Sequence, residues 1–121
     1  MMIDRLKLVP GFWYLATPYS KYRDGLEAAF IEASRAAAVL TKAGVGVFSP
    51  IAHTHPVAVH GGIDPLDHAI WLPADAPMME AAAGLVVVKM DGWQESYGIG
   101  EEIKAFKQMG RPIEYMEWPN G

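Results

Sequence analysis

The chain has 121 residues, of which 51% are hydrophobic and 20% are charged. This length fits a single domain over residues 1–121, and the apolar fraction is far too high for a disordered chain. Fourteen acidic and ten basic residues give a net charge of −4. That charge argues against a nucleic acid polymer as partner, because proteins that bind one present a basic face.

No cysteine occurs in the chain, which excludes disulfides, a thiolate nucleophile and a zinc–thiolate site. No apolar run approaches the roughly 18 residues that a membrane-spanning helix needs. Residues 1–11 lack the long apolar stretch and the small-residue cleavage site of a signal peptide. We therefore expect a cytoplasmic protein with no membrane partner.

The first predicted elements are a strand, a loop and a helix. Trp13–Ala16 is a short apolar run and is predicted as the strand. Residues 17–20 are predicted as the loop, because Pro18 disfavours a helical conformation in the residue before it. Asp24 is the predicted N-cap of the helix, with Glu27 as its capping-box partner. An apolar stripe at spacings of three and four follows, formed by Leu26, Phe30, Ala33, Ala37 and Leu40.

The segment that follows is punctuated by glycine, serine and proline. Gly44 is expected to end the helix just after its C-cap. Val45–Phe48 is predicted as the second strand, closed by Ser49 and Pro50. Residues 49–63, which are rich in His, Pro and Gly, are predicted as a long loop. Loops of this length in compact domains are often functional.

Two helices and a buried strand are predicted next. Asp64 followed by Pro65 is typical of an N-cap with proline at the first helical position, and this helix should end before Pro73. A separate helix is predicted over residues 76–83. Gly84–Val88 is a near-continuous apolar run of the kind that is buried on both faces of a parallel sheet.

A helix over residues 97–109 and a strand over residues 112–116 complete the order βαβααβαβ. This alternation predicts an α/β fold: a doubly wound, flavodoxin- or Rossmann-like parallel sheet of about four to five strands with helices on both faces. Ligands bind such sheets beyond the carboxyl ends of the strands. Three segments meet that condition, residues 17–20, 49–60 and 91–102.

Helical phase distinguishes the two adjacent glutamates of the last helix. Glu102 lies three residues after Ile99 and four before Phe106, which places it within the buried stripe. Glu101 lies outside the stripe and three residues before Lys104, so a solvated ion pair is expected there. A carboxylate on the buried face near a helix N-terminus is costly unless it is used or well bonded, which makes Glu102 the candidate functional acid.

The histidines are candidate metal ligands. His53 and His55 would share one face if the segment were extended, and His60 follows nearby. No carboxylate lies at a zinc-like spacing and Pro56 interrupts the segment, so a loop that shapes a ligand pocket is favoured over a metal site. We expect no metal and no cofactor.

Three motifs together resemble the nucleoside 2-deoxyribosyltransferase superfamily, most of all a small branch described only as a domain of unknown function. The first two are Tyr14-Leu15-Ala16-Thr17-Pro18-Tyr19-Ser20 and Phe48-Ser49-Pro50-Ile51-Ala52-His53-Thr54-His55-Pro56. The third is Gly92-Trp93-Gln94-Glu95-Ser96-Tyr97-Gly98 with Glu102. The superfamily has its catalytic glutamate six residues after an Asp or Ser and four after a Gly, a spacing that Ser96, Gly98 and Glu102 match. The resemblance covers about residues 13–116.

The resemblance implies that the protein cleaves an N-glycosidic bond. Glu102 would attack the anomeric carbon of a 2-deoxyribosyl group, and water or a second base would then take the sugar. Members with Ser at the position of Ser96 tend to accept a 5′-phosphate, which favours a deoxynucleoside monophosphate over a nucleoside. The expected substrate-binding residues are Tyr14, Thr17, Pro18, Tyr19, Ser20, Ser49, His53, Trp93, Ser96 and Gly98.

The chain departs from the superfamily just before the third strand, where an Asp is often found and Ala83 stands here. Asp67 and Asp75 are the candidates to replace that carboxylate, and no motif decides between them. Relatives assemble as dimers or larger oligomers, so a homo-oligomer is expected, with Trp71, Met78 and Met79 as candidate interface residues. The alternative to an enzyme is a nucleotide-binding module that has kept the pocket and lost catalysis.

Overall fold

The computed structural model describes residues 2–119. Its centre is a four-stranded sheet of order β2-β1-β3-β4, in which every neighbouring pair is parallel. The strands are β1 (Trp13–Ala16), β2 (Val47–Phe48), β3 (Gly84–Val88) and β4 (Ile113–Met116). The predicted doubly wound parallel α/β fold is therefore confirmed.

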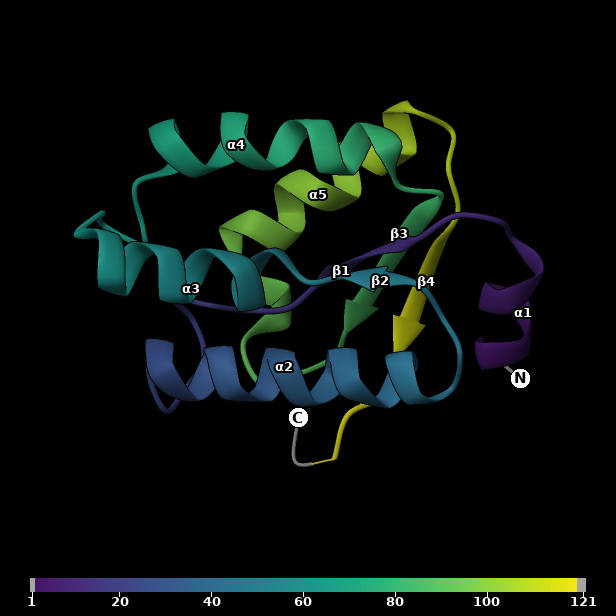
Figure 1. Ribbon diagram of the computed structural model, residues 1–121, viewed down its shortest axis with the longest axis horizontal. Coiled ribbons are helices and arrows are strands. Elements are labelled where there is room, and N and C mark those ends of the chain that lie inside the picture. The colour runs from purple at the N-terminus through teal and green to yellow at the C-terminus, as the bar shows by residue number, and fades with distance from the viewer. Residues whose placement is uncertain (1, 120–121) are drawn as a thin grey trace.

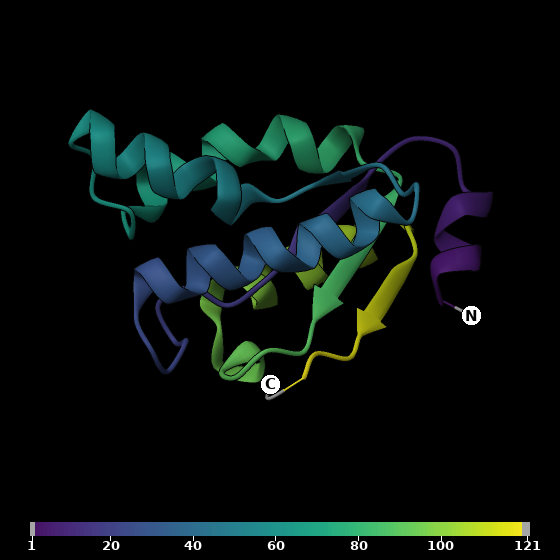
Figure 2. The same cartoon turned by 60° about the horizontal axis from the view of Figure 1, so that its bottom comes forward.

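Helices cover both faces of the sheet (Figure 1). On one face, α1 (Met2–Leu8) and α2 (Leu26–Lys42) bury Leu6 and Leu40 against β3 and β4. On the other face, α5 (Tyr97–Gln108) buries Ile99 and Phe106 together with Tyr14 of β1. Figure 2 shows α2 lying across its face of the sheet, beside β3 and β4.

Two more helices and a short turn of 3-10 helix complete the described elements. They are α3 (Pro50–Gly61), α4 (His68–Ala81) and η1 (Trp93–Glu95). Helix α3 lies between α2 and α4, and α4 runs above α5 (Figure 1). Within residues 2–119, no helix has both the length and the apolar character needed to cross a membrane.

Helix α2 follows its predicted stripe, but its start differs from the prediction. Its N-cap is Gly25, and no side chain caps it, so the predicted capping box at Asp24 and Glu27 is wrong. Its end is as predicted: Gly44 has a φ of +88°, and its N–H and that of Val45 donate to the carbonyls of Thr41 and Leu40. This bond pair ends a helix in the Schellman arrangement.

The predicted long loop over residues 49–63 is wrong, because most of it forms α3. Ser49 caps this helix by accepting a hydrogen bond from the N–H of Ala52 at 3.2 Å, and Pro50 occupies its first position. Gly62 closes it with a left-handed φ of +70°. These are ordinary start and stop signals, and the proline at position 56 inside the helix concealed them.

The predicted pair of helices on either side of Pro73 is also wrong. Helix α4 runs without a break through Pro73 and Pro77, and it is capped by Asp67 rather than Asp64. Each internal proline removes a hydrogen bond and costs about 3 kcal/mol. Packing offsets this cost, since Trp71 is buried and Met78 and Met79 pack against the core beside α5.

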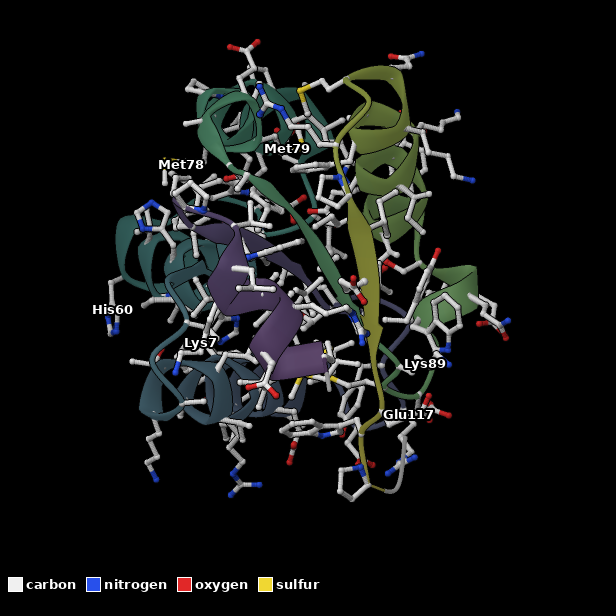
Figure 3. All side chains as sticks on the ribbon, turned by 90° about the vertical axis from the view of Figure 1, so that its right-hand side faces the viewer. Lys7, His60, Met78, Met79, Lys89 and Glu117 are labelled. Atoms are coloured by element: carbon white, nitrogen blue, oxygen red, sulfur yellow. The ribbon has the colours of Figure 1, made fainter. Side chains whose placement is uncertain are left out.

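The predicted interface residues are largely used within their own chain. Trp71 is buried, and its indole N–H donates to the carbonyl of Asp64 at 2.9 Å. Met78 and Met79 are partly buried at the end of α4 that approaches the sheet (Figure 3). A homo-oligomer stays a prediction, and these three side chains offer little surface for it.

Candidate active site

A small pocket opens beyond the carboxyl end of β1, beside the first two turns of α5. Its position is the point where the chain, having placed β2 on one side of β1, crosses to place β3 on the other. This switch point is where open α/β sheets bind ligands. The cavity has a volume of about 90 Å³, which is enough to enclose a small group rather than a whole nucleotide.

Four of the predicted site residues line this pocket: Tyr14, Tyr19, Gly98 and Glu102. Tyr14 comes from β1, Tyr19 from the loop after it, and the other two from α5. Two segments that are far apart in sequence, residues 14–19 and 98–102, therefore meet at one place. The convergence of Glu102 with the two tyrosines is the feature that the sequence could not provide.

Glu102 is a partly buried carboxyl group in an unfavourable place for a charge. Burial, reinforced by the negative charge of Asp75, raises the pKa of Glu102 to about 8. Hydrogen bonding from Tyr14 works in the opposite direction and lowers the pKa. Burial and the charge of Glu102 in turn raise the pKa of Tyr14, so this phenol keeps its proton and can serve as a donor.

The predicted difference between the two glutamates of α5 is confirmed. Glu101 forms an ion pair with Lys104 at 3.1 Å, and its side chain is 38% exposed at the edge of the pocket. Glu102 is the sixth residue of α5 and belongs to the second turn. The free N–H groups of the first turn therefore do little to keep Glu102 ionised, because the dipole effect fades within that turn.

Asp75 of α4 adds a carboxyl group to the pocket from a second helix. Burial raises the pKa of Asp75 to about 6, and the nearby His53 reduces this shift. Asp67 has a different task, because it caps α4 by accepting from the N–H of Ala69 at 3.1 Å. Of the two acids considered as replacements for the missing Asp, the pocket holds Asp75.

Ala83 lies at the other end of the sheet. Its N–H donates to the carbonyl of Phe12 at 2.8 Å, before the first residue of both β1 and β3. The pocket lies beyond the opposite ends of these strands. An alanine at position 83 therefore removes nothing from the pocket.

The remaining predicted site residues do not line the pocket. Ser49 and Ser96 are helix N-caps that accept hydrogen bonds from backbone N–H groups at 3.2 and 3.3 Å. Trp93 packs beside Tyr115, with ring centroids 5.9 Å apart. The others are Thr17 and Pro18, which are buried, and Ser20 and His53, which are exposed.

Two of these residues stay close to the site. The Oγ1 atom of Thr17 is buried just after β1 and has no hydrogen-bond partner within residues 2–119. His53 lies near enough to Asp75 to act on its pKa. Both are neighbours of the pocket rather than parts of its wall.

The histidines do not share a face, because their segment is helical rather than extended. His53 is exposed, whereas His55 is buried with only 5% of its surface accessible. Residues two apart on a helix are expected to point in opposite directions in this way. Among the described residues, no three His, Asp or Glu side chains gather in a way that could hold a metal ion.

His55 belongs instead to a hydrogen-bonded chain that sequence reasoning missed. The hydroxyl of Tyr19 lies 2.6 Å from Nδ1 of His55, and Nε2 of the same ring lies 2.6 Å from a carboxylate oxygen of Glu27. Ser49 followed by Pro50 is a helix-start signal, and a helix predicted from it would have placed His55 beside the pocket. Ile51, Thr54 and His55 then fall on one helical face, and the first two line the pocket.

A comparison with curated proteins finds no match to this chain. A family model described as "Domain of unknown function (DUF1937)" matches residues 11–118, which include every strand and all the residues of the pocket. Because this match covers most of its length, the chain belongs to the DUF1937 family of domains of unknown function.

Proposed function

We propose that the protein cleaves the N-glycosidic bond of a 2-deoxynucleoside or its 5′-monophosphate, with Glu102 as the nucleophile. The observation that carries this proposal is the meeting of Glu102, Asp75 and Tyr14 in one pocket at the switch point of the sheet. The motif resemblance to the nucleoside 2-deoxyribosyltransferase superfamily supplies the reaction class. The pocket supplies a carboxyl pair, which glycoside-cleaving enzymes use.

In the first step, a carboxylate oxygen of Glu102 attacks C1′ of the sugar. The bond from C1′ to the base nitrogen breaks, and its electron pair leaves with the base, which takes up a proton. A covalent ester joins the sugar to Glu102. The positive charge that develops at C1′ favours the ionised form of Glu102, and hydrogen bonding from the Tyr14 hydroxyl favours the same form by lowering the pKa of Glu102.

In the second step, water attacks C1′ and the ester bond breaks, which frees the Glu102 carboxylate. Asp75 takes the proton of the water, since a pKa of about 6 leaves it largely ionised at neutral pH while still able to accept a proton. If a second base takes the place of water, the same intermediate gives 2-deoxyribosyl transfer.

A 5′-phosphate would lie near the start of α5 in this proposal. The Ser96 hydroxyl accepts from the N–H of Ile99 and can still donate its own hydrogen to a phosphate oxygen. A Cβ at position 98 would lie 4.0 Å from the Oγ atom of Ser96, so the glycine leaves this side of the hydroxyl uncovered. An acidic chain must hold phosphate by such local donors, because its net charge of −4 gives no attraction.

A nucleotide-binding module without catalysis is the alternative from another class. The absence of an Asp at position 83 would favour it, but that position lies at the end of β3 away from the pocket. The pocket holds the carboxyl groups of Asp75 and Glu102 without it. The enzyme is therefore the better-supported proposal.

The test uses chromatography to measure the release of free base from a panel of deoxynucleosides and their 5′-monophosphates. We expect release by the unmodified protein and none above background by Glu102→Gln. Glu80→Gln, at an exposed position of α4 outside the pocket, is the matched control and should keep full activity. Nucleotide binding without release, equal in both variants, would establish the binding module instead.

A further inference from the structure

The chain of Tyr19, His55 and Glu27 has the arrangement of a catalytic triad. Tyr19 lines the pocket and lies 2.6 Å from Nδ1 of His55. The second ring nitrogen lies 2.6 Å from Oε2 of Glu27. The His55 side chain is 7% exposed, whereas that of Glu27 is 72% exposed. A group at the pocket is thus joined to a buried base, which an acid orients from behind.

Hydrogen-bond chemistry fixes the direction of this chain. A carboxylate only accepts, so Nε2 of His55 carries a hydrogen and donates it to Glu27. Nδ1 then accepts the Tyr19 hydrogen when the ring is neutral, and donates to the Tyr19 oxygen when the ring is an imidazolium. Only in the second case is the Tyr19 hydroxyl hydrogen free to point into the pocket.

The imidazole is held rigidly between two helices. Phe30 stacks on the ring at a centroid distance of 4.7 Å and an angle of 22°, and Tyr19 meets the ring edge-on at 89°. Glu27 and Phe30 are three residues apart and share one face of α2, while His55 comes from α3. Such fixed geometry is what a proton-transfer group needs.

We propose that Tyr19 is the catalytic residue that gives a proton to the departing base, and that His55 and Glu27 are its positioning residues. This inference rests on the proposed N-glycosidic cleavage and assigns the proton that the first step requires. The two phenols of the pocket then have different roles: Tyr14 donates a hydrogen bond to the nucleophile Glu102, and Tyr19 protonates the leaving group.

The proton transfer balances as follows. As the bond to C1′ breaks, the base nitrogen keeps the electron pair and takes the hydrogen of the Tyr19 hydroxyl. The Tyr19 oxygen takes the Nδ1 hydrogen of the His55 imidazolium, which becomes neutral while Nε2 still donates to Glu27. After the products leave, the ring recovers a proton from solvent through Tyr19, and Asp75 releases to solvent the proton it took from water.

The test compares two substrates that differ in their need for a proton. Adenine leaves 2′-deoxyadenosine 5′-monophosphate poorly unless it is protonated, whereas 4-nitrophenolate leaves a 4-nitrophenyl 2-deoxyriboside as an anion. We expect Tyr19→Phe to slow adenine release by about 10²–10⁴-fold, the usual range for loss of a general acid, and to leave nitrophenolate release unchanged. Tyr115→Phe, an exposed tyrosine of β4, is the matched control.

Glu27→Gln gives a second variant at an exposed position, so the test does not depend on folding of Tyr19→Phe. We expect it to slow adenine release by about fivefold, as for loss of a charge at an exposed partner, and again to spare nitrophenolate release. Equal slowing of both substrates in both variants would overturn the role of Tyr19.

Glu102→Gln separates this inference from the proposed function. Loss of both reactions in Glu102→Gln, with a Tyr19→Phe effect that does not depend on the leaving group, would refute the triad and leave the proposed function standing. Activity on both substrates that survives Glu102→Gln, or no release by the unmodified protein, would overturn the proposed function and the triad together.

Discussion

Asp75 and Glu102 face one pocket from two different helices, and the charge of Asp75 adds to burial in raising the pKa of Glu102 to about 8. Two acids that share a poorly solvated site cannot both ionise easily. The pair thus holds a proton near neutral pH. This single relationship controls both the activity and the stability that we expect of the protein.

The activity of the protein should rise with pH. In the proposed mechanism Glu102 attacks only when ionised, so kcat/KM for base release should increase as the pH rises toward about 8. Asp75→Asn removes a negative charge that raises the pKa of Glu102, so the rise should move to lower pH. A pH–rate profile of the two proteins measures this. A rise at the same pH in Asp75→Asn would show that the two acids do not interact.

The stability of the protein should fall as pH rises from about 4.5 to about 8. In this range the folded chain keeps the Glu102 proton, whereas the unfolded chain, with the ordinary pKa of 4.5, has released it. The free energy of unfolding is therefore highest below pH 4.5 and falls as the pH rises toward 8. The loss is on the order of a few kcal/mol, since one pKa unit is worth about 1.4 kcal/mol.

Glu102→Gln tests this linkage, because an amide has no proton to lose. We expect the variant to unfold at a higher urea concentration than the unmodified protein at pH 8, and the difference to shrink at pH 4.5. Glu80→Gln serves as the control on an exposed helix position. A difference that is constant with pH would mean that the Glu102 carboxyl is not shifted in the folded chain.

Ser96→Asp should separate the two roles given to Ser96. Aspartate caps helices about as well as serine, so the stability of α5 should be preserved, whereas Ser96→Ala should lose about 1 kcal/mol. If a 5′-phosphate binds there, the new charge should weaken binding of a deoxynucleoside monophosphate by about tenfold relative to the nucleoside. Calorimetric titration with both ligands measures this ratio, and an unchanged ratio would place the phosphate elsewhere.

Gly92 should not tolerate a side chain. Its φ is +83°, and an added Cβ would lie 2.3 Å from the carbonyl oxygen of Lys21. Gly92→Ala should therefore destabilise the chain by more than the roughly 1–3 kcal/mol of backbone strain. Gly62→Ala is the control, since its φ of +70° carries the strain but its surroundings are open. Chemical denaturation of both variants should show the larger loss for Gly92→Ala.

Local signals in the sequence are enough to predict much of the fold. The apolar run of β3, the stripe of α2 and the stop at Gly44 each depend on residues within a few positions of one another. The separation of Glu101 from Glu102 likewise needs only helical periodicity, and the ion pair of Glu101 with Lys104 follows from it.

Packing overrode local preference in the middle of the chain. Pro56, Pro73 and Pro77 each disfavour the helix that contains them, and the local sequence therefore predicts a loop and a break. The structure keeps α3 and α4 helical because burial of Trp71 and His55, among others, outweighs the lost hydrogen bonds. Such contacts join residues far apart in sequence, so no local pattern reports them.

Strand and helix periodicity are local properties, so the parallel α/β order and the place of Glu102 on the buried face of its helix could both be predicted from the sequence. Which side chains share a pocket with Glu102 depends on the folded chain: Tyr14 comes from β1, Tyr19 from the loop after it, and Asp75 from α4. The position and protonation of a buried carboxyl depend on everything packed around it, and that surrounding exists only when the chain is folded.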